Sequence, residues 1–337
     1  MRAFPALALA VGSWAAGSAA LAQPFGFPTA NRALLTPGGE PAFFAATPGQ
    51  PWVTGSFGCV RSEGGQWHEG LDIRCLRRDQ QGEPSDPVVA TADGVVAYFS
   101  LKPALSNYGR YVILRHQVEG IEIFSLYAHL SQVRPDLQPG LAVRAGEAIG
   151  VMGRSTNTGA GISRERAHVH FELNLRLSDS FTTWQKQHQP GQRNDHGEWN
   201  GHNFLGIDPA QVFRDEARLG PHFSLLNQLR SQAELCRVRV RRTGFAWLRR
   251  CPGLIVPNPT AEREGVAGWE LALNYAGIPF QLIPRAASEL KGKGAVQLVS
   301  VNESEREEHP CRRLVVRRGG RWELSPRGSE LIDLLVH

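Results

Sequence analysis

The chain has 337 residues, of which 37 are Lys or Arg and 32 are Asp or Glu, giving a net charge of +5. This length is enough for two domains, and no apolar run beyond the N-terminus reaches the ~18 residues of a membrane span. We therefore expect no transmembrane segment in the mature chain, and no nucleic-acid partner. The charge is uneven, because residues 23–235 carry 19 basic and 21 acidic side chains whereas residues 236–337 carry 17 and 11.

The N-terminus has the features of a secretory signal peptide. Arg2 precedes a short apolar run over residues 6–16, and the Ala-Leu-Ala of residues 20–22 fits a cleavage site. We expect residues 1–22 to be removed and the mature protein to be exported, to the periplasm or the medium. Gln23 follows the expected cleavage site, where a lipid-anchored protein would need a cysteine.

Residues 23–50 are rich in Pro, Ala and Gly and have no period, which predicts an arm or linker. Beyond residue 50 the pattern favours strands. Residues 87–90 and 95–99 are expected strands around an Asp93-Gly94 turn, and residues 111–114 and 121–127 around a Glu119-Gly120 turn. Residues 169–175 alternate as a further strand. These features predict a mainly β, antiparallel domain over residues 51–215.

The rest of the chain is expected to form a connection and a second module. Residues 176–203 are polar and show no helix or strand period, which favours a surface insertion over a second metal site. The linker over residues 216–235 is expected to contain a short helix at 224–234. Residues 237–241, 294–301 and 313–316 are expected strands of a small, basic, β-rich module over residues 236–337, whose type the sequence does not identify.

Five cysteines lie beyond the signal segment, and an exported protein can keep disulfides. Proximity in the sequence favours Cys59 with Cys75 and Cys236 with Cys251, which leaves Cys311 over. Connectivity cannot be deduced from the sequence alone. No CxxC pair occurs, so a zinc-thiolate site is disfavoured.

Histidines and one aspartate provide the strongest functional signal. His168 and His170 lie two apart in an alternating segment, so a strand places both rings on one face, with Cα atoms about 6.6 Å apart. His68 and Asp72 also share a face if their segment is extended, and Gly70 argues against a helix there. Imidazoles with a carboxylate suit zinc, and a catalytic zinc keeps three protein ligands and one open position. Spacing alone does not say which ring of the His168/His170 pair is a ligand.

Three motifs together resemble the lysostaphin/LytM-type zinc metallopeptidases. They are His68-x-x-x-Asp72, the Tyr-Ala-His-Leu of residues 127–130, and the His-Val-His-Phe-Glu of residues 168–172. The flanking turns at 93–94, 107–112, 138–140 and 146–150 agree, and the resemblance covers about residues 50–210. It implies that His68, Asp72 and His170 hold Zn²⁺ and that His129 and His168 are catalytic histidines that do not bind the metal.

The resemblance implies an exported zinc endopeptidase that cuts peptide cross-links or stem peptides of peptidoglycan. One alternative is a non-catalytic envelope regulator or binding protein on the same fold, and another is an endopeptidase for exported proteins. All five motif positions are intact, which favours the enzyme. The basic module would then dock on an anionic envelope polymer, or else be an ordinary arginine-rich surface.

Overall fold

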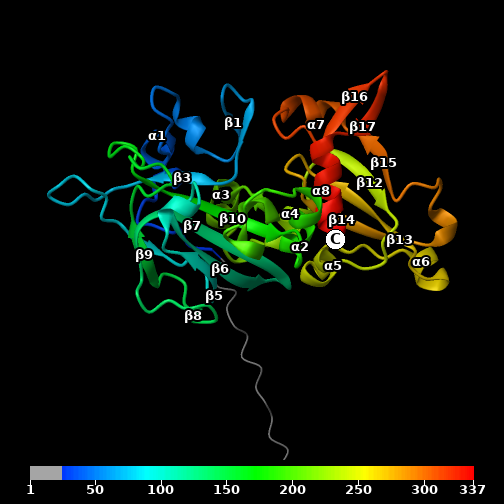
Figure 1. Ribbon diagram of the computed structural model, residues 1–337, viewed down its shortest axis with the longest axis horizontal. Helices are drawn as coiled ribbons and strands as arrows, with labels where there is room; N and C mark the ends of the chain where they lie inside the picture. The colour runs from blue at the N-terminus through cyan, green and yellow to red at the C-terminus, as the bar shows by residue number, and fades with distance from the viewer. Residues whose placement is uncertain (1–24) are drawn as a thin grey trace, which may run out of the picture.

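The computed structural model describes residues 25–337, and the signal peptide expected over residues 1–22 lies outside them. Two lobes lie side by side, with the N-terminal two thirds of the chain in one and the C-terminal third in the other (Figure 1). The strands of the first lobe are β1 (Gly58–Arg61), β2 (Gln66–His68), β3 (Leu71–Arg74), β4 (Pro87–Val89), β5 (Gly94–Ser100), β6 (Arg110–Val118), β7 (Ile121–Val133), β8 (Ala142–Val143), β9 (Ala148–Met152), β10 (His168–Arg176) and β11 (Phe204–Ile207). Its α-helices are α1 (Glu40–Phe43), α2 (Phe181–His188) and α3 (Pro209–Leu219).

A nine-stranded sheet forms the first lobe, and every strand pair in it is antiparallel. Strand β10 lies inside this sheet, with β7 on one edge and β3 followed by β11 on the other. Eight of its nine residues are buried. The expectation of a mainly β, antiparallel fold is confirmed, and β10 is the strand on which the site is built.

One of the two predicted hairpins is confirmed. Strands β6 and β7 pair from Val118 and Ile121 onward, and Glu119 and Gly120 between them have φ of 51° and 77°, as a tight two-residue turn requires. The hairpin predicted at Asp93-Gly94 is wrong. Its two strands exist, but β4 pairs with β9 while β5 pairs with β6 and β8. Gly94 begins β5 rather than closing a turn.

The segment after residue 24 packs on the sheet, which corrects the expectation of an arm or linker. Phe25, Phe27, Phe43 and Phe44 are all buried. The ring of Phe27 stacks on that of Phe213 in α3 at 4.3 Å, and Phe44 forms a bridge to Ile73 of β3. Aromatic side chains in this Pro- and Gly-rich stretch thus complete the core.

The structure contains helices in segments whose sequence shows no clear helical period. In the segment expected to be irregular, α2 buries Phe181 and Trp184, one turn apart. Asp208 caps α3 through its side chain, which accepts hydrogen bonds from the backbone of Ala210 and Gln211. The linker helix is confirmed as α4 (Leu225–Arg230), capped by Ser224. The domain limits predicted from the sequence remain predictions.

The second lobe contains a four-stranded antiparallel sheet in the order β14-β13-β12-β15, and a separate hairpin of β16 with β17. The expected strands at 237–241, 294–301 and 313–316 correspond to β12, β15 and β16. The bounds are β12 (Cys236–Val240), β13 (Gly268–Leu273), β14 (Pro279–Arg285), β15 (Val296–Val301), β16 (Val315–Arg318), β17 (Arg321–Leu324), α5 (Ala246–Arg250), α6 (Pro259–Glu264), α7 (Glu303–Glu308) and α8 (Pro326–Val336).

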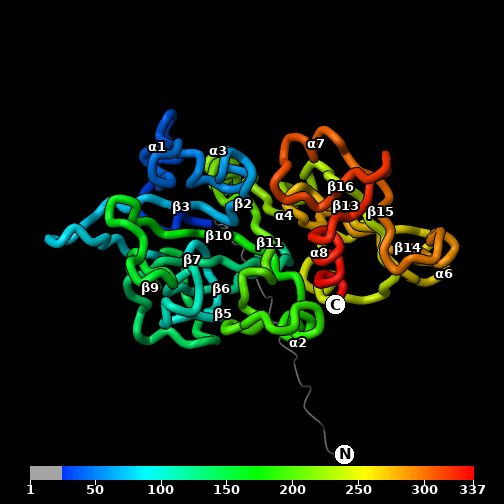
Figure 2. The backbone as a smooth tube through the Cα atoms, turned by 45° about the horizontal axis from the view of Figure 1, so that its top comes forward, coloured from blue at the N-terminus to red at the C-terminus, as the bar shows by residue number. Residues whose placement is uncertain are grey.

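The lobes meet along α8, which runs at their boundary in both views (Figure 2). Trp184 of α2 donates to Asp333 of α8 at 2.6 Å. The buried Arg250 of α5 donates to the carbonyl oxygen of Leu177 at 2.7 Å. Buried hydrophobic residues form a continuous cluster from Phe25 to Val336. Among the described helices, none is both long and apolar enough to cross a membrane.

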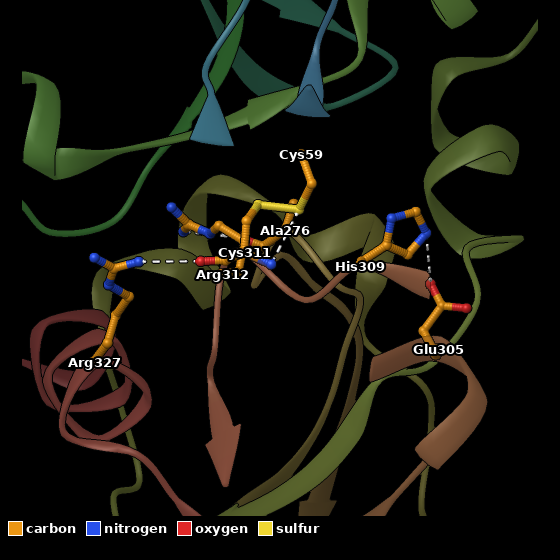
Figure 3. Close-up of a disulfide and its surroundings, with 7 residues drawn as sticks. All are labelled: Cys59, Ala276, Glu305, His309, Cys311, Arg312 and Arg327. Carbon is orange, nitrogen blue, oxygen red and sulfur yellow. Dashed lines mark hydrogen bonds and ion pairs between the residues drawn. A yellow bond between two sulfur atoms is a disulfide. The ribbon is translucent and has the colours of Figure 1, made fainter. Parts of the chain in front are cut away.

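A disulfide joins Cys59 of β1 to Cys311 of the second lobe (Figure 3). Both pairings favoured by proximity, Cys59 with Cys75 and Cys236 with Cys251, are therefore wrong. Cys75, Cys236 and Cys251 are buried free thiols. The folded sheets, and not the distance along the chain, bring Cys59 and Cys311 together.

Candidate metal centre

Strand pairing gathers the predicted ligands at one point of the large sheet. His170 of β10 is directly opposite Asp72 of β3 on one side and Ala128 of β7 on the other. His129 follows Ala128, and His68 ends β2, just before β3. His68, Asp72, His168 and His170 are all buried. All five predicted site residues therefore lie together, although their roles remain predictions.

The three expected ligands present one atom each to a common point. His170 Nδ1 is 3.0 Å from Asp72 Oδ1 and 3.2 Å from His68 Nε2, and His68 Nε2 is 3.2 Å from Asp72 Oδ1. Tetrahedral zinc with bonds of about 2.0–2.1 Å would separate its ligand atoms by about 3.3 Å. The spacing of these three atoms fits such an ion, and they form a possible metal-holding group of the described residues.

The outer nitrogens of both rings are held in the orientation that a metal requires. His68 Nδ1 donates to the carbonyl oxygen of Ser56 at 2.7 Å, so its Nε2 lone pair points inward. His170 Nε2 lies 2.8 Å from Glu172 Oε1, which leaves its Nδ1 lone pair facing Asp72. Three acceptor atoms so close together would repel one another unless a cation or proton lay between them.

Glu172 is itself fixed by two donors, and the site attracts positive charge. Tyr108 donates its hydroxyl to Glu172 Oε1 at 2.7 Å, and Asn174 donates to Oε2 at 2.6 Å. Burial opposes a charge on His170, but the carboxylates of Asp72 and Glu172 outweigh it and raise the pKa of the imidazole to about 10. Such outer contacts commonly fix the orientation of metal-binding histidines.

Two arginines hold the second oxygen of Asp72. Arg61 Nη2 and Arg166 Nη2 each donate to Asp72 Oδ2 at 2.7 Å. This arrangement leaves Oδ1 for the histidine side of the site. Arg61 Nη2 also lies 2.8 Å from His68 Nε2, so its guanidinium reaches the edge of the ligand group.

His129 and His168 lie beside the three expected ligands. The two rings are 4.9 Å apart, and His129 is 6.0 Å from the ring of His170. His129 Nδ1 donates to the Ser155 carbonyl oxygen at 2.9 Å. Burial, reinforced by His168 and His170, holds the pKa of His129 well below its usual value, so its imidazole stays neutral. A neutral ring with a free Nε2 can accept a proton.

His168 also lies close to the three expected ligands. Its Nδ1 donates to the Arg166 carbonyl oxygen at 2.6 Å, and its Nε2 is 3.3 Å from Asp72 Oδ1. Geometry therefore leaves both rings of the His168/His170 pair near the metal position. The separation of their roles rests on the family resemblance.

Sequence reasoning missed Arg61, Arg166 and Tyr108, and gave Glu172 no role. The parity of β10 offered a signal for Glu172, which lies two residues after His170 on the same face. The polar segment at 188–202 forms no further metal cluster within residues 25–337. Its buried His196 contacts the hydroxyl of Tyr98 at 3.0 Å instead.

The buried histidines and aspartate on this antiparallel sheet form a group that could hold a metal ion. Residues 66–181, which are 116 of the 337, match the model of peptidase family M23. The LytM/lysostaphin-type resemblance is thereby confirmed. No match was found among curated proteins.

Solved structures with similar segments include three bacterial proteins. The lytM protein of Ruminococcus gnavus is 24% identical over 44% of this chain and 46% of its own, with a TM-score of 0.29. A zinc-containing peptidase of Vibrio cholerae is 22% identical over 39% and 36%, with a TM-score of 0.26. The lysostaphin catalytic domain of Staphylococcus simulans is 23% identical over 35% and 74%, with a TM-score of 0.25. The chain thus spans less than half of the first two proteins.

Proposed function

We propose that the protein is an exported zinc endopeptidase that hydrolyses peptide bonds of peptidoglycan cross-links or stem peptides. The observation that carries the proposal is the convergence of His68 Nε2, Asp72 Oδ1 and His170 Nδ1 within 3.0–3.2 Å of one another. This group lies in the segment that matches the model of a peptidase family. The five intact positions favour the enzyme over a non-catalytic regulator.

The residues of the chain would divide the work as follows. His68, Asp72 and His170 would hold the ion, and Glu172 and Ser56 would fix the two rings. A bound zinc would supply Lewis-acid activation of water and of the scissile carbonyl group. Neutral His129 would accept the proton of the attacking water, since its free Nε2 is not used in the contact with Ser155. His168 would donate a hydrogen bond to the developing oxyanion once it is protonated.

Export and the wall substrate are supported by different features. The N-terminal sequence has a charged start, an apolar run and a small-residue cleavage pattern. The disulfide between Cys59 and Cys311 suits an oxidising compartment. The motifs resemble those of peptidases that act on peptidoglycan, and this resemblance favours wall peptides over exported proteins as substrate.

An anionic envelope polymer is a further proposed partner of the second lobe. Arg318 and Arg321 face each other across the tip of the β16–β17 hairpin, joined by two glycines. Both are exposed, and neither forms an ion pair with another of the described residues. Unpaired charges on a projecting hairpin can contact a polyanion without rearrangement of the lobe.

Digestion of purified peptidoglycan, with products identified by mass spectrometry, tests the proposed function directly. We expect zinc-dependent release of new amino termini from wall peptides, which chelation abolishes and added zinc restores. An unfolded exported protein serves as the competing substrate. Cleavage of that protein without cleavage of wall peptides would favour the protein-processing alternative, and no cleavage of either would favour the regulator.

A further inference from the structure

A cavity of about 550 Å³ lies between the two lobes, beside the candidate metal centre. The first lobe contributes β2, β10, β11 and α2 to its wall, and the second contributes α8 and the segment that precedes β16. Residues on opposite walls include Trp67 and Glu172 from the first lobe, and Arg312 and Arg327 from the second. The family segment therefore supplies only part of this cavity.

Two residues of the cavity wall are close to predicted ligands. Trp67 in its wall directly precedes His68, and Glu172 in its wall contacts His170 Nε2 at 2.8 Å. A peptide bound with its scissile bond at the metal could thus extend a side chain or terminus into the cavity. The five predicted site residues do not line the cavity themselves, so it lies beside the metal position and not over it.

Arg312 is the unusual member of the wall. Its Nη2 donates to the carbonyl oxygen of Ala276 at 3.0 Å, and its guanidinium lies 4.9 Å from the centre of the Trp67 ring. Its Nε is buried and has no hydrogen-bond partner among the described residues. No carboxylate of residues 25–337 lies within ion-pair distance of Arg312. Burial lowers its pKa to about 10, an effect that the charge of Glu69 opposes and that of Arg327 reinforces.

The acidic residues of the same wall differ in this respect. Glu172 already receives hydrogen bonds from Tyr108 and Asn174 and contacts His170. Glu330 accepts from Gln189. Glu69 is exposed, and it forms no ion pair with Arg312 although its charge favours the charged form of that guanidinium. Arg312 is therefore the buried charge of this wall that has no ion-pair partner among the described residues.

We infer that this cavity binds a carboxylate group of the peptide substrate, and that Arg312 receives it. A guanidinium that has no ion-pair partner among the described residues can donate to a carboxylate from its two Nη groups, of which only Nη2 forms a hydrogen bond, to Ala276. The exposed Arg327, whose side chain lies on the same side of the disulfide as Arg312, would add a second positive charge (Figure 3). The inference rests on the proposed peptidase function and specifies its substrate class as peptides with a free carboxylate.

The disulfide explains how an arginine of the second lobe is held at this position. Cys311 directly precedes Arg312, and its partner Cys59 is opposite Trp67 in the β1–β2 pair. The bridge therefore keeps Arg312 against Trp67, next to the strand that ends in His68. The second lobe would thus contribute to substrate recognition, in addition to any binding of an envelope polymer.

The test compares a soluble peptidoglycan stem peptide with the same peptide whose carboxylates are converted to amides. Arg312→Met, Arg312→Lys and the wild type are assayed for KM and kcat on both peptides, and for binding by calorimetry. For the acidic peptide, we expect Arg312→Met to raise KM about 10- to 100-fold while kcat stays within about twofold, the range for a hydrogen bond to a charged group. The amidated peptide should bind equally weakly to the wild type and to Arg312→Met. Arg312→Lys should restore part of the affinity.

Arg242→Met is the matched control, because it removes the same charge from an exposed position of the same lobe that lies outside the cavity wall. It should leave KM unchanged for both peptides. Equal losses for acidic and amidated peptides in Arg312→Met, in a variant whose melting temperature is unchanged, would overturn the inference. Carboxylate-dependent binding that Arg312→Met abolishes, without cleavage of either peptide, would instead refute the proposed function and leave the inference standing.

Discussion

Cys59 is bonded to Cys311, 252 residues later in the chain, and this bond fastens β1 of the first lobe to the second. Since Cys59 is opposite Trp67 in the β1–β2 pair, the bond also restrains the strand that ends in His68. The disulfide thus links the second lobe to the strand that carries a predicted metal ligand. The contribution of this disulfide to stability can be measured.

Cys311→Ser should lower the free energy of unfolding by roughly 2–5 kcal/mol, the usual effect of removing a native disulfide. We also expect weaker zinc binding, because β2 loses its restraint. Denaturant unfolding and metal titration measure the two effects. Cys75→Ser is the control, since it removes a buried free thiol that takes no part in the bond. Equal effects of both substitutions would contradict a specific role for the disulfide.

His68→Ala, Asp72→Ala and His170→Ala should each remove most of the bound zinc. Each would delete one of only three protein ligands, and the two that remain cannot hold a tetrahedral ion tightly. Elemental analysis of purified, folded variants gives the zinc content, which we expect to be close to one per chain in the wild type. Full zinc in all three variants would exclude these residues as ligands.

His129→Ala and His168→Ala should retain zinc and lose turnover by about 10²- to 10⁴-fold, the usual contribution of a general acid or base. The His168 variant is the more informative, because His168 Nε2 lies 3.3 Å from Asp72 Oδ1. Zinc content and kcat are measured on the same preparations. If His168→Ala loses its metal while His170→Ala keeps it, the roles of the two rings are reversed.

Glu216 should make stability depend on pH. Burial raises the pKa of its carboxyl to about 7, a shift that the hydrogen bond from the Phe25 backbone N–H, at 2.9 Å, only partly offsets. An acid whose pKa is higher in the folded state than in the unfolded state stabilises the fold when protonated, so this contribution falls as pH rises from about 4 to 7.

Glu216→Gln keeps an oxygen acceptor for Phe25 and cannot ionise. We therefore expect it to be more stable than the wild type at pH 8 and about equal to it at pH 5. Urea unfolding at the two pH values is the measurement. A difference of the same size at both values would show that Glu216 is not titrating.

Replacing Arg318 and Arg321 with serine should weaken sedimentation of the protein with cell-wall sacculi at low salt. In the wild type, raising the ionic strength should have the same effect, because exposed charges are screened beyond about 8 Å at physiological salt. Cleavage of a small soluble peptide should not change. The control is the double substitution of Arg77 and Lys102 with serine, two exposed cations of the first lobe. Equal binding of both double variants would refute a role for the hairpin.

Features set by the geometry of a single strand could be predicted from the sequence. The two-residue period of β10 correctly placed His168 and His170 on one face. Gly70 correctly argued against a helix, although the chain bends there between β2 and β3 and is not one extended segment. Contacts between distant segments were not predictable, because nothing local encodes them. The cysteine pairing, the contact of Arg61 and Arg166 with Asp72, and the partners of β4 and β5 all depend on how the sheets close.

The segment that matches the family model is shorter than the first lobe, which extends beyond it at both ends. A fragment cut at residues 66–181 would lose β1, β11 and α3, and with α3 the ring of Phe213, which stacks on Phe171 at 5.8 Å. It would also lose Arg61, and the aromatic residues of 25–44 that cover the sheet. The smallest piece that we expect to fold is therefore larger than the segment that matches the family model.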